Sequence, residues 1–181
     1  MSDASLYQQV LGSAFDALPA PVRALHADTG ARRWSGVAEV RRGRGTVSRL
    51  VAAVFGFPPA GSDVPVSVRL SPERGGERWT RDFAGHTFSS WQRRGHGRDA
   101  HLLVERFGIV DVALALVVDG DRLRLVPRRW SCLGIPLPAR LLPAGRTFET
   151  VHDGRFVFDV EIAVPIVGLI AGYRGTLQPV R

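Results

Sequence analysis

Residues 63–83, with the sequence DVPVSVRLSPERGGERWTRDF, decide the fold class. In the first half of this stretch every second residue is apolar: Val64, Val66, Val68 and Leu70. That period is typical of a β-strand with one buried face. The pair Gly75-Gly76 then predicts a hairpin turn into a second strand, on which Trp79, Arg81 and Phe83 share one face. The stretch therefore predicts two antiparallel strands joined by a tight turn.

The same period of two continues through most of the remaining chain. Glycine-containing turns separate the alternating segments, and short turns join antiparallel neighbours because a parallel pair needs a long crossover. A further alternating segment precedes the hairpin, so we expect the sheet over residues 33–42 and 63–178. A sheet of about nine twisted strands tends to curl. The sequence therefore predicts an antiparallel β barrel or half-barrel.

Helical periodicity is confined to the first third of the chain. Residues 4–27 carry an apolar stripe interrupted by Pro19, which predicts two short helices. A third helix is expected at 46–56, where Thr46 can cap the start. Its expected buried face consists of Val47, Leu50, Val51, Val54 and Phe55. The predicted class is α+β, with two or three N-terminal helices, and residues 1–181 are expected to form a single domain.

The basic composition excludes several kinds of chemistry. The formal net charge is +7, and all 24 basic residues are arginine. Without lysine there can be no P-loop lysine and no Schiff base with a carbonyl substrate. The arginines are spread over the whole chain and form no dense patch, which argues against nucleic acid as a partner.

Three further features favour the cytoplasm. No apolar run approaches the ~20 residues that a membrane-spanning helix needs. Residues 1–10 lack the charged start and apolar stretch of a secretory signal. The lone cysteine, Cys132, cannot form an internal disulfide.

Several short runs resemble an uncharacterised bacterial family, domain of unknown function 4166. They are ERWTRDF at 77–83, GIPLP at 134–138, GRFVFDV at 154–160, Gly168-Leu169 and Tyr173-Arg174-Gly175. The resemblance covers residues 6–177 and implies neither a reaction nor catalytic residues. Some members of this family follow a saccharopine-dehydrogenase-like NAD(P)-binding domain, so the resemblance implies an oxidoreductase as a partner. We expect no such domain within residues 1–181, which resemble a stand-alone version.

Arg81 lies between Trp79 and Phe83 on one strand face, and these three residues form a candidate ligand site. An arginine that faces an apolar interior needs a partner. It could bind a ligand carboxylate at the base of a cavity. Alternatively it could lie on the outer face, or pair across the sheet with Glu105, Glu149 or Asp159.

The segment 131–145 combines three prolines with many apolar residues. Proline prevents a regular strand, and the apolar content makes a fully solvated loop costly. We expect it to cap a cavity, with Leu137 and Leu141 as ligand contacts, or to form a contact surface for a membrane or a partner protein. The structural alternative is a strap that closes one end of the core.

Polar candidates elsewhere are weaker. Arg44, Gly45 and Thr46 stand at a helix start, where backbone N–H groups can hold an anion; the alternative is a turn and a helix cap. The carboxylates of Asp159 and Glu161 are expected on the outer face, since their neighbours make the better core face. The histidines lack metal-ligand spacing, so no metal and no cofactor is expected.

These patterns favour a non-catalytic domain that binds an apolar or amphipathic small molecule inside a curved sheet. One alternative is an interaction module for a membrane surface or an oxidoreductase. Another is an enzyme with Asp82, His86 or Glu105 as acid or base near Arg81. No residue is assigned a catalytic role.

Overall fold

The computed structural model describes residues 4–180. The α-helices are α1 (Leu6–Leu11), α2 (Ala20–Ala27) and α3 (Thr46–Val54), and the 3-10 helices are η1 (Gly12–Ala17), η2 (Gly97–Asp99) and η3 (Ala139–Leu141). The strands are β1 (Arg32–Arg42), β2 (Gly61–Glu73), β3 (Gly76–Phe83), β4 (His86–Arg94), β5 (Leu103–Phe107), β6 (Val110–Asp119), β7 (Arg122–Cys132), β8 (Ile135–Pro136), β9 (Phe148–His152), β10 (Arg155–Val164) and β11 (Gly168–Pro179). Among these residues no helix is both long and apolar enough to cross a bilayer.

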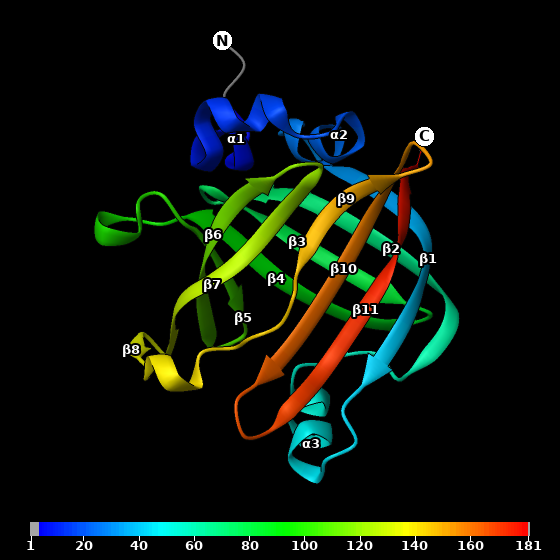
Figure 1. The fold of residues 1–181 in the computed structure, drawn as a ribbon, viewed down its shortest axis with the longest axis vertical. Helices are drawn as coiled ribbons and strands as arrows, with labels where there is room; N and C mark the ends of the chain where they lie inside the picture. The colour runs from blue at the N-terminus through cyan, green and yellow to red at the C-terminus, as the bar shows by residue number, and fades with distance from the viewer. Residues whose placement is uncertain (1–3, 181) are drawn as a thin grey trace.

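Ten strands close into a barrel, and the two-residue β8 lies outside it (Figure 1). The order around the barrel is β6-β5-β4-β3-β2-β1-β11-β10-β9-β7, and β7 pairs back onto β6. Every pairing is antiparallel. The α+β barrel that the sequence predicts is confirmed, with complete closure and one strand more than expected.

The N-terminal helical elements close one end of the barrel, here called the capped end (Figure 1). The lead-in expected over 4–27 is present, but its first helix changes to 3-10 geometry at Gly12, where φ is +56°. Tyr7 and Leu25 point into the barrel and are fully buried. The last described residues also lie at this end, since the Val180 N–H donates to the carbonyl of Arg33.

The opposite end, here called the α3 end, is formed by segments 43–60, 84–85, 108–109, 133–147 and 165–167. Because strands alternate in direction, every second turn of the barrel lies at this end. Helix α3 lies across it (Figure 1). Gly43 fixes where the chain leaves β1, because a Cβ at this position would lie 1.8 Å from the carbonyl oxygen of Leu169 on β11.

The orientation of α3 corrects the prediction for this helix. Val47, Leu50 and Val54 were expected in the core, but 56%, 65% and 74% of their surface is exposed. The predicted apolar stripe covers a wider sector of the helix than the barrel end contacts. Of the five residues in the stripe, only Val51 and Phe55 face inward. The helix also ends at Val54 rather than 56, and its cap position is Gly45 without a side-chain bond, so Thr46 is not the cap.

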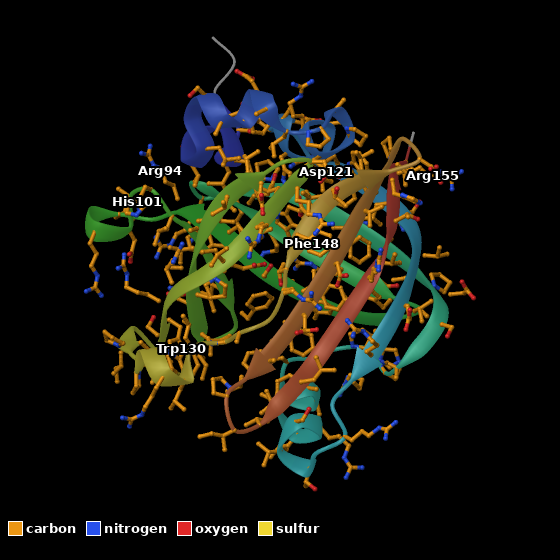
Figure 2. The ribbon with its side chains drawn as sticks, viewed as in Figure 1. Arg94, His101, Asp121, Trp130, Phe148 and Arg155 are labelled. Atoms are coloured by element: carbon orange, nitrogen blue, oxygen red, sulfur yellow. The ribbon has the colours of Figure 1, made fainter. Side chains whose placement is uncertain are left out.

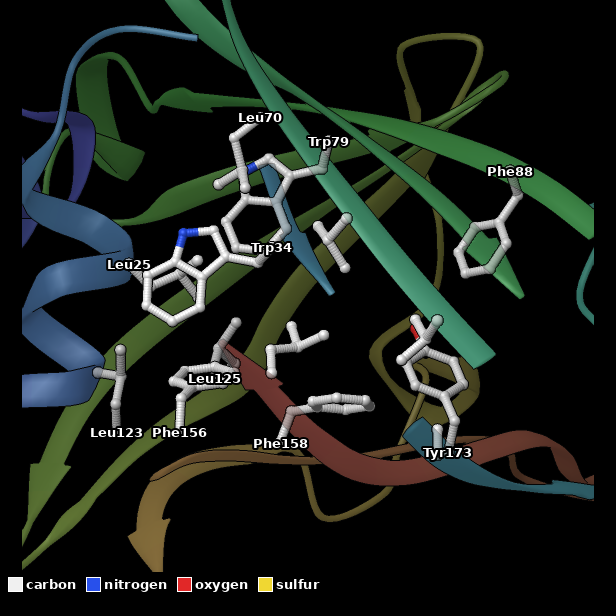
Figure 3. Close-up of a cluster of buried hydrophobic side chains, with 14 of the residues drawn as sticks. Leu25, Trp34, Leu70, Trp79, Phe88, Leu123, Leu125, Phe156, Phe158 and Tyr173 are labelled. Carbon is white, nitrogen blue, oxygen red and sulfur yellow. The ribbon is translucent and has the colours of Figure 1, made fainter. Parts of the chain in front are cut away.

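Aromatic side chains are distributed along the barrel interior: Trp34, Trp79 and Phe156 lie near helix α2, and Phe88 and Tyr173 lie farther from it (Figure 3). Trp34 of β1 packs edge-on against Phe156 of β10, with ring centroids 6.0 Å apart. On β10 the even-numbered residues from Phe156 onward face inward, whereas Asp159 and Glu161 face outward. The outer-face prediction for these two carboxylates is confirmed, because each lies beside an arginine on the barrel surface.

Candidate ligand-binding site

The barrel interior contains a cavity of about 390 Å³ that is partly open to the outside. Its walls are aliphatic and aromatic, and they come from most strands of the barrel; Val66, Val68, Val112, Leu114, Leu125 and Phe158 are representative. Closure of the sheet gives each barrel strand a hydrogen-bonded neighbour on both sides, and the β4–β5 and β7–β9 pairings are the short ones. The volume lies within the ~300–1,000 Å³ range of small-molecule sites.

The structure places the predicted residues of the β3 face at this cavity. Trp79, Arg81 and Phe83 all line it, as their alternation requires. Leu137 and Leu141 do not line it, because β8 and η3 turn their part of the chain away from the barrel. The predicted cap 131–145 reaches the cavity only through its last residues, Pro143 to Gly145.

Arg81 is held inside the barrel by an ion pair. Its guanidinium donates to Ser90 Oγ at 2.8 Å and to Glu105 Oε1 at 3.2 Å, and the Ser90 hydroxyl donates to the same carboxylate oxygen at 2.6 Å. Only 11% of the Arg81 side chain and 9% of the Glu105 side chain are exposed. Of the partners that the sequence left open, Glu105 is the one observed. The positive charge at the cavity wall is thus balanced within the protein.

A polar cluster lies where the capped end meets the cavity. The Tyr7 hydroxyl donates to Gln92 Oε1 at 3.2 Å. The Tyr7 ring stacks on His26 at 3.6 Å between centroids, and His26 Nε2 lies 2.5 Å from Glu149 Oε2. Tyr7, Gln92 and Glu149 line the cavity, whereas His26 is covered. One end of an otherwise apolar cavity therefore offers polar groups.

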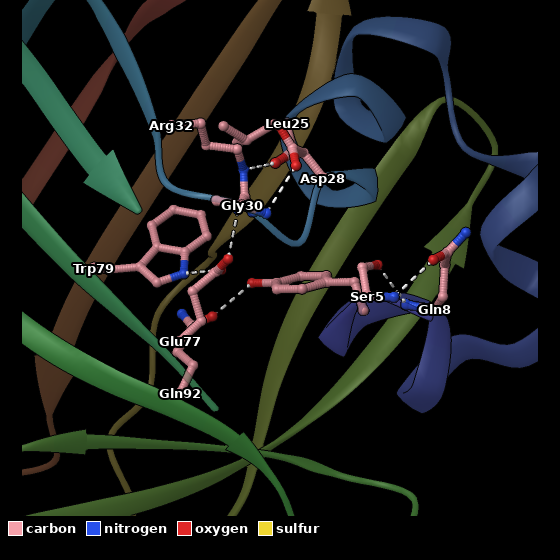
Figure 4. Close-up of polar contacts among 10 residues, drawn as sticks. Ser5, Gln8, Leu25, Asp28, Gly30, Arg32, Glu77, Trp79 and Gln92 are labelled. Atoms are coloured by element: carbon pink, nitrogen blue, oxygen red, sulfur yellow. Dashed lines mark hydrogen bonds and ion pairs between the residues drawn. The ribbon is translucent and has the colours of Figure 1, made fainter. Parts of the chain in front are cut away.

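A second buried ion pair, between Arg32 and Glu77, lies next to this cluster (Figure 4). Glu77 Oε1 lies 2.7 Å from Arg32 NH1, and its Oε2 accepts a hydrogen bond from Trp79 Nε1 at 2.8 Å. Arg32 also donates through Nε to the carbonyl of Leu25 at 2.8 Å. This network connects helix α2 to strand β3 and fixes the Trp79 ring at the cavity wall.

Two buried tyrosines give the site a predictable response to alkali. Burial raises the pKa of Tyr173 to about 12. Burial, with the nearby carboxylates of Glu149, Glu105 and Glu77, raises the pKa of Tyr7 well above its ordinary value of 10.0. Both phenols are therefore neutral near neutral pH, and both can donate hydrogen bonds.

We expect the protein to lose stability as the pH rises above about 10. The unfolded chain releases these phenolic protons near pH 10, whereas the folded chain holds that of Tyr173 to about 12, so alkali favours unfolding. Tyr173→Phe should flatten this part of the stability-against-pH curve, measured by urea unfolding at each pH. An unchanged slope in this variant would show that Tyr173 is not the group responsible.

Other residues singled out in the sequence do not join the site. Arg44, Gly45 and Thr46 are exposed at the start of α3, outside the cavity. Asp82 lies on the outer face of β3, where it accepts hydrogen bonds from Thr87 Oγ1 and the Gly85 N–H. His86 shares the inner phase of β4 with Phe88, but it is the first residue of the strand, is exposed and does not line the cavity. Within residues 4–180 no three His, Cys, Asp or Glu side chains gather as a metal site.

Sequence reasoning missed most of the polar cluster. Gln92 has a local signal, since it shares the inner phase of β4 with Phe88 and Ser90. Tyr7 and His26 have none, because each lies on a helix and meets the barrel only through long-range packing.

Comparison with known proteins identifies a family and little else. The sequence profile described as Domain of unknown function (DUF4166) matches residues 18–177. No curated protein matches the chain. A crystal structure described as a candidate thioesterase II from Thermobifida fusca YX is similar at 11% identity, covering 100% of this chain and 89% of that one, with a TM-score of 0.24. A TM-score that low carries no argument about fold or reaction.

Proposed function

The chain belongs to the DUF4166 family, whose description assigns no activity, and from the geometry of the barrel we propose that it binds a small, largely apolar molecule with an uncharged polar end. The observation that carries this proposal is the cavity of about 390 Å³ inside the closed sheet. A well-packed interior has few voids larger than a water molecule. An apolar cavity of this size would be filled favourably by an apolar ligand.

The polar end of the ligand is inferred from the charges around the cavity. Arg81 is already paired with Glu105, and Glu149 adds a second carboxylate at the capped end. A ligand carboxylate there would need a free cation, and desolvating it without one is costly. A hydroxyl or carbonyl group needs only hydrogen bonds, which at this end the Gln92 amide N–H can donate and the Tyr7 hydroxyl oxygen can accept. The geometry therefore favours an alcohol, ester or ketone over a fatty acid.

Competition between matched ligands tests this proposal. The neutral fluorophore N-phenyl-1-naphthylamine should bind the purified protein and gain fluorescence. Dodecanol should displace it at roughly tenfold or more lower concentration than dodecanoate at neutral pH, because only the carboxylate is charged. Equal displacement, or preferred displacement by dodecanoate, would contradict the inferred polarity of the site.

A pair of variants on β6 locates the binding. Leu114→Trp places a larger side chain in the cavity and should abolish fluorophore binding. Val117→Trp, on the outer face of the same strand, should leave binding unchanged. Circular dichroism and thermal melting would confirm that both variants fold. Unaltered binding in a folded Leu114→Trp protein would remove the cavity as the site.

A further inference from the structure

Exposed apolar side chains are concentrated at the α3 end. Among residues 4–180, ten large apolar side chains are exposed, and seven of them belong to this end: Val47, Leu50, Val54, Ile109, Leu133, Ile135 and Ile166. They come from α3 and from three separate turns. Ile166, at the β10–β11 turn, is 97% exposed. An apolar surface of this kind marks a site of association.

The two ends of the barrel also differ in charge. The segments of the α3 end contain four arginines, Arg44, Arg49, Arg140 and Arg146, and no acidic residue. These arginines are exposed, and none has an ion-pair partner among the described residues. At the capped end the turns carry Asp28, Asp99, Asp121 and Asp153 together with Arg74 and Arg98, so acidic residues are in the majority there. The α3 end therefore combines apolar side chains with unopposed positive charge.

Helix α3 connects this surface to the cavity. Its Val51 and Phe55 line the cavity, while Leu50 and Val54 point to the outside. Both faces of the helix are thus apolar, whereas a helix at the edge of a globular protein has one polar face. Figure 2 places Trp130, another cavity-lining residue, beside η3 at the same end, and Arg155 at the capped end.

We propose that the α3 end rests on the surface of an anionic lipid bilayer. The exposed residues are aliphatic, whereas the core of a protein–protein contact is enriched in aromatic residues. Arginines among them complement anionic headgroups, which attract basic groups near the surface. A bilayer also holds apolar molecules of the kind proposed for the cavity. The inference rests on the proposed function for this last argument alone.

Vesicle flotation tests the proposal. The full chain should float with vesicles of phosphatidylcholine and phosphatidylglycerol, and more weakly with phosphatidylcholine alone. Leu50→Ser/Val54→Ser should weaken binding to the mixed vesicles by roughly tenfold or more, since the burial of two aliphatic side chains is lost. Arg44→Gln/Arg49→Gln should weaken vesicle binding by a similar factor at low salt. At high salt, where charges are screened, this variant and the unaltered chain should bind equally.

Matched variants outside the α3 end provide the controls. Val37→Ser/Val117→Ser removes two exposed apolar residues from the barrel wall, and Arg69→Gln/Arg155→Gln removes two exposed arginines, neither from this end. Both should retain vesicle binding. Equal losses in controls and test variants, or no flotation of the unaltered chain, would overturn the proposal. A third result would also overturn the proposal: the chain fails to bind vesicles, forms a dimer in sedimentation equilibrium, and becomes monomeric when Leu50→Ser/Val54→Ser is introduced.

The two proposals can fail separately. Leu114→Trp should lose the fluorophore but keep vesicle binding, because it alters only the cavity. Leu50→Ser/Val54→Ser should lose vesicles but keep the fluorophore. If vesicle binding fails while fluorophore binding persists, only the membrane contact is refuted.

Discussion

Replacing Glu77 by alanine is expected to lower the free energy of unfolding by about 3–5 kcal/mol. The carboxylate is buried, and it is the ion-pair partner of Arg32 and the acceptor for the Trp79 indole N–H. Without it, the Arg32 side chain, which is only 9% exposed, loses its counter-ion and keeps only backbone carbonyl acceptors, and the Trp79 indole N–H loses its acceptor. The loss is large because water cannot replace the missing partner.

Urea unfolding followed by circular dichroism measures this effect. Glu73→Ala is the matched control, because Glu73 lies on the same hairpin and binds Arg78, but at the protein surface. Its loss should be clearly smaller, since solvent screens that pair. Glu77→Gln keeps an acceptor and should fall between the wild type and Glu77→Ala. If Glu73→Ala and Glu77→Ala are equally destabilising, burial of the Arg32–Glu77 pair has no special importance.

Arg81→Met is expected to be similarly destabilising, by about 3–5 kcal/mol. The substitution leaves the Glu105 carboxylate in the barrel with the Ser90 hydroxyl as its remaining side-chain partner. A charge buried without a counter-ion is costly, so much of the loss should come from Glu105 itself.

The double variant Arg81→Met/Glu105→Gln separates the two contributions. Removing the carboxylate charge should restore a large part of the stability, although it adds a second substitution. If the double variant is less stable than Arg81→Met, the ion pair is not the source of the effect. Packing of the Arg81 guanidinium on the Trp79 ring, 5.1 Å from its centroid, would then be the better explanation.

Strand periodicity was sufficient to predict the barrel. The alternation of Val64, Val66, Val68 and Leu70 is a local property, and each short turn restricts the next strand to an antiparallel position. Inner and outer faces follow from the same alternation, which is why the sequence alone predicts that Trp79, Arg81 and Phe83 share one face. Full closure of the barrel does not follow from the short turns alone. It requires β7 to pair with β9, and these two strands are connected by the irregular segment 133–147.

The orientation of α3 could not be predicted for a related reason. Five of its apolar residues fall within one broad sector of the helix, and the periodicity does not say which edge of that sector meets the barrel. The choice depends on contacts with β11, where Ser48 donates to the carbonyl of Leu169 at 2.5 Å. The polar cluster at the capped end could not be predicted either, because it too depends on contacts between residues far apart in the sequence. Tyr7 and Gln92 are 85 residues apart in sequence, and no local pattern brings them together.

The described part of the chain begins at residue 4 and ends at residue 180, both beside the N-terminal helices, and this has a practical consequence. An affinity tag or a fluorescent protein attached at either terminus would stand on the side of the barrel remote from α3. Immobilising the protein through such a tag would leave α3 and its neighbouring turns facing the solution. In a natural fusion to another domain, the same geometry would present this surface outward, whichever terminus carried the additional domain.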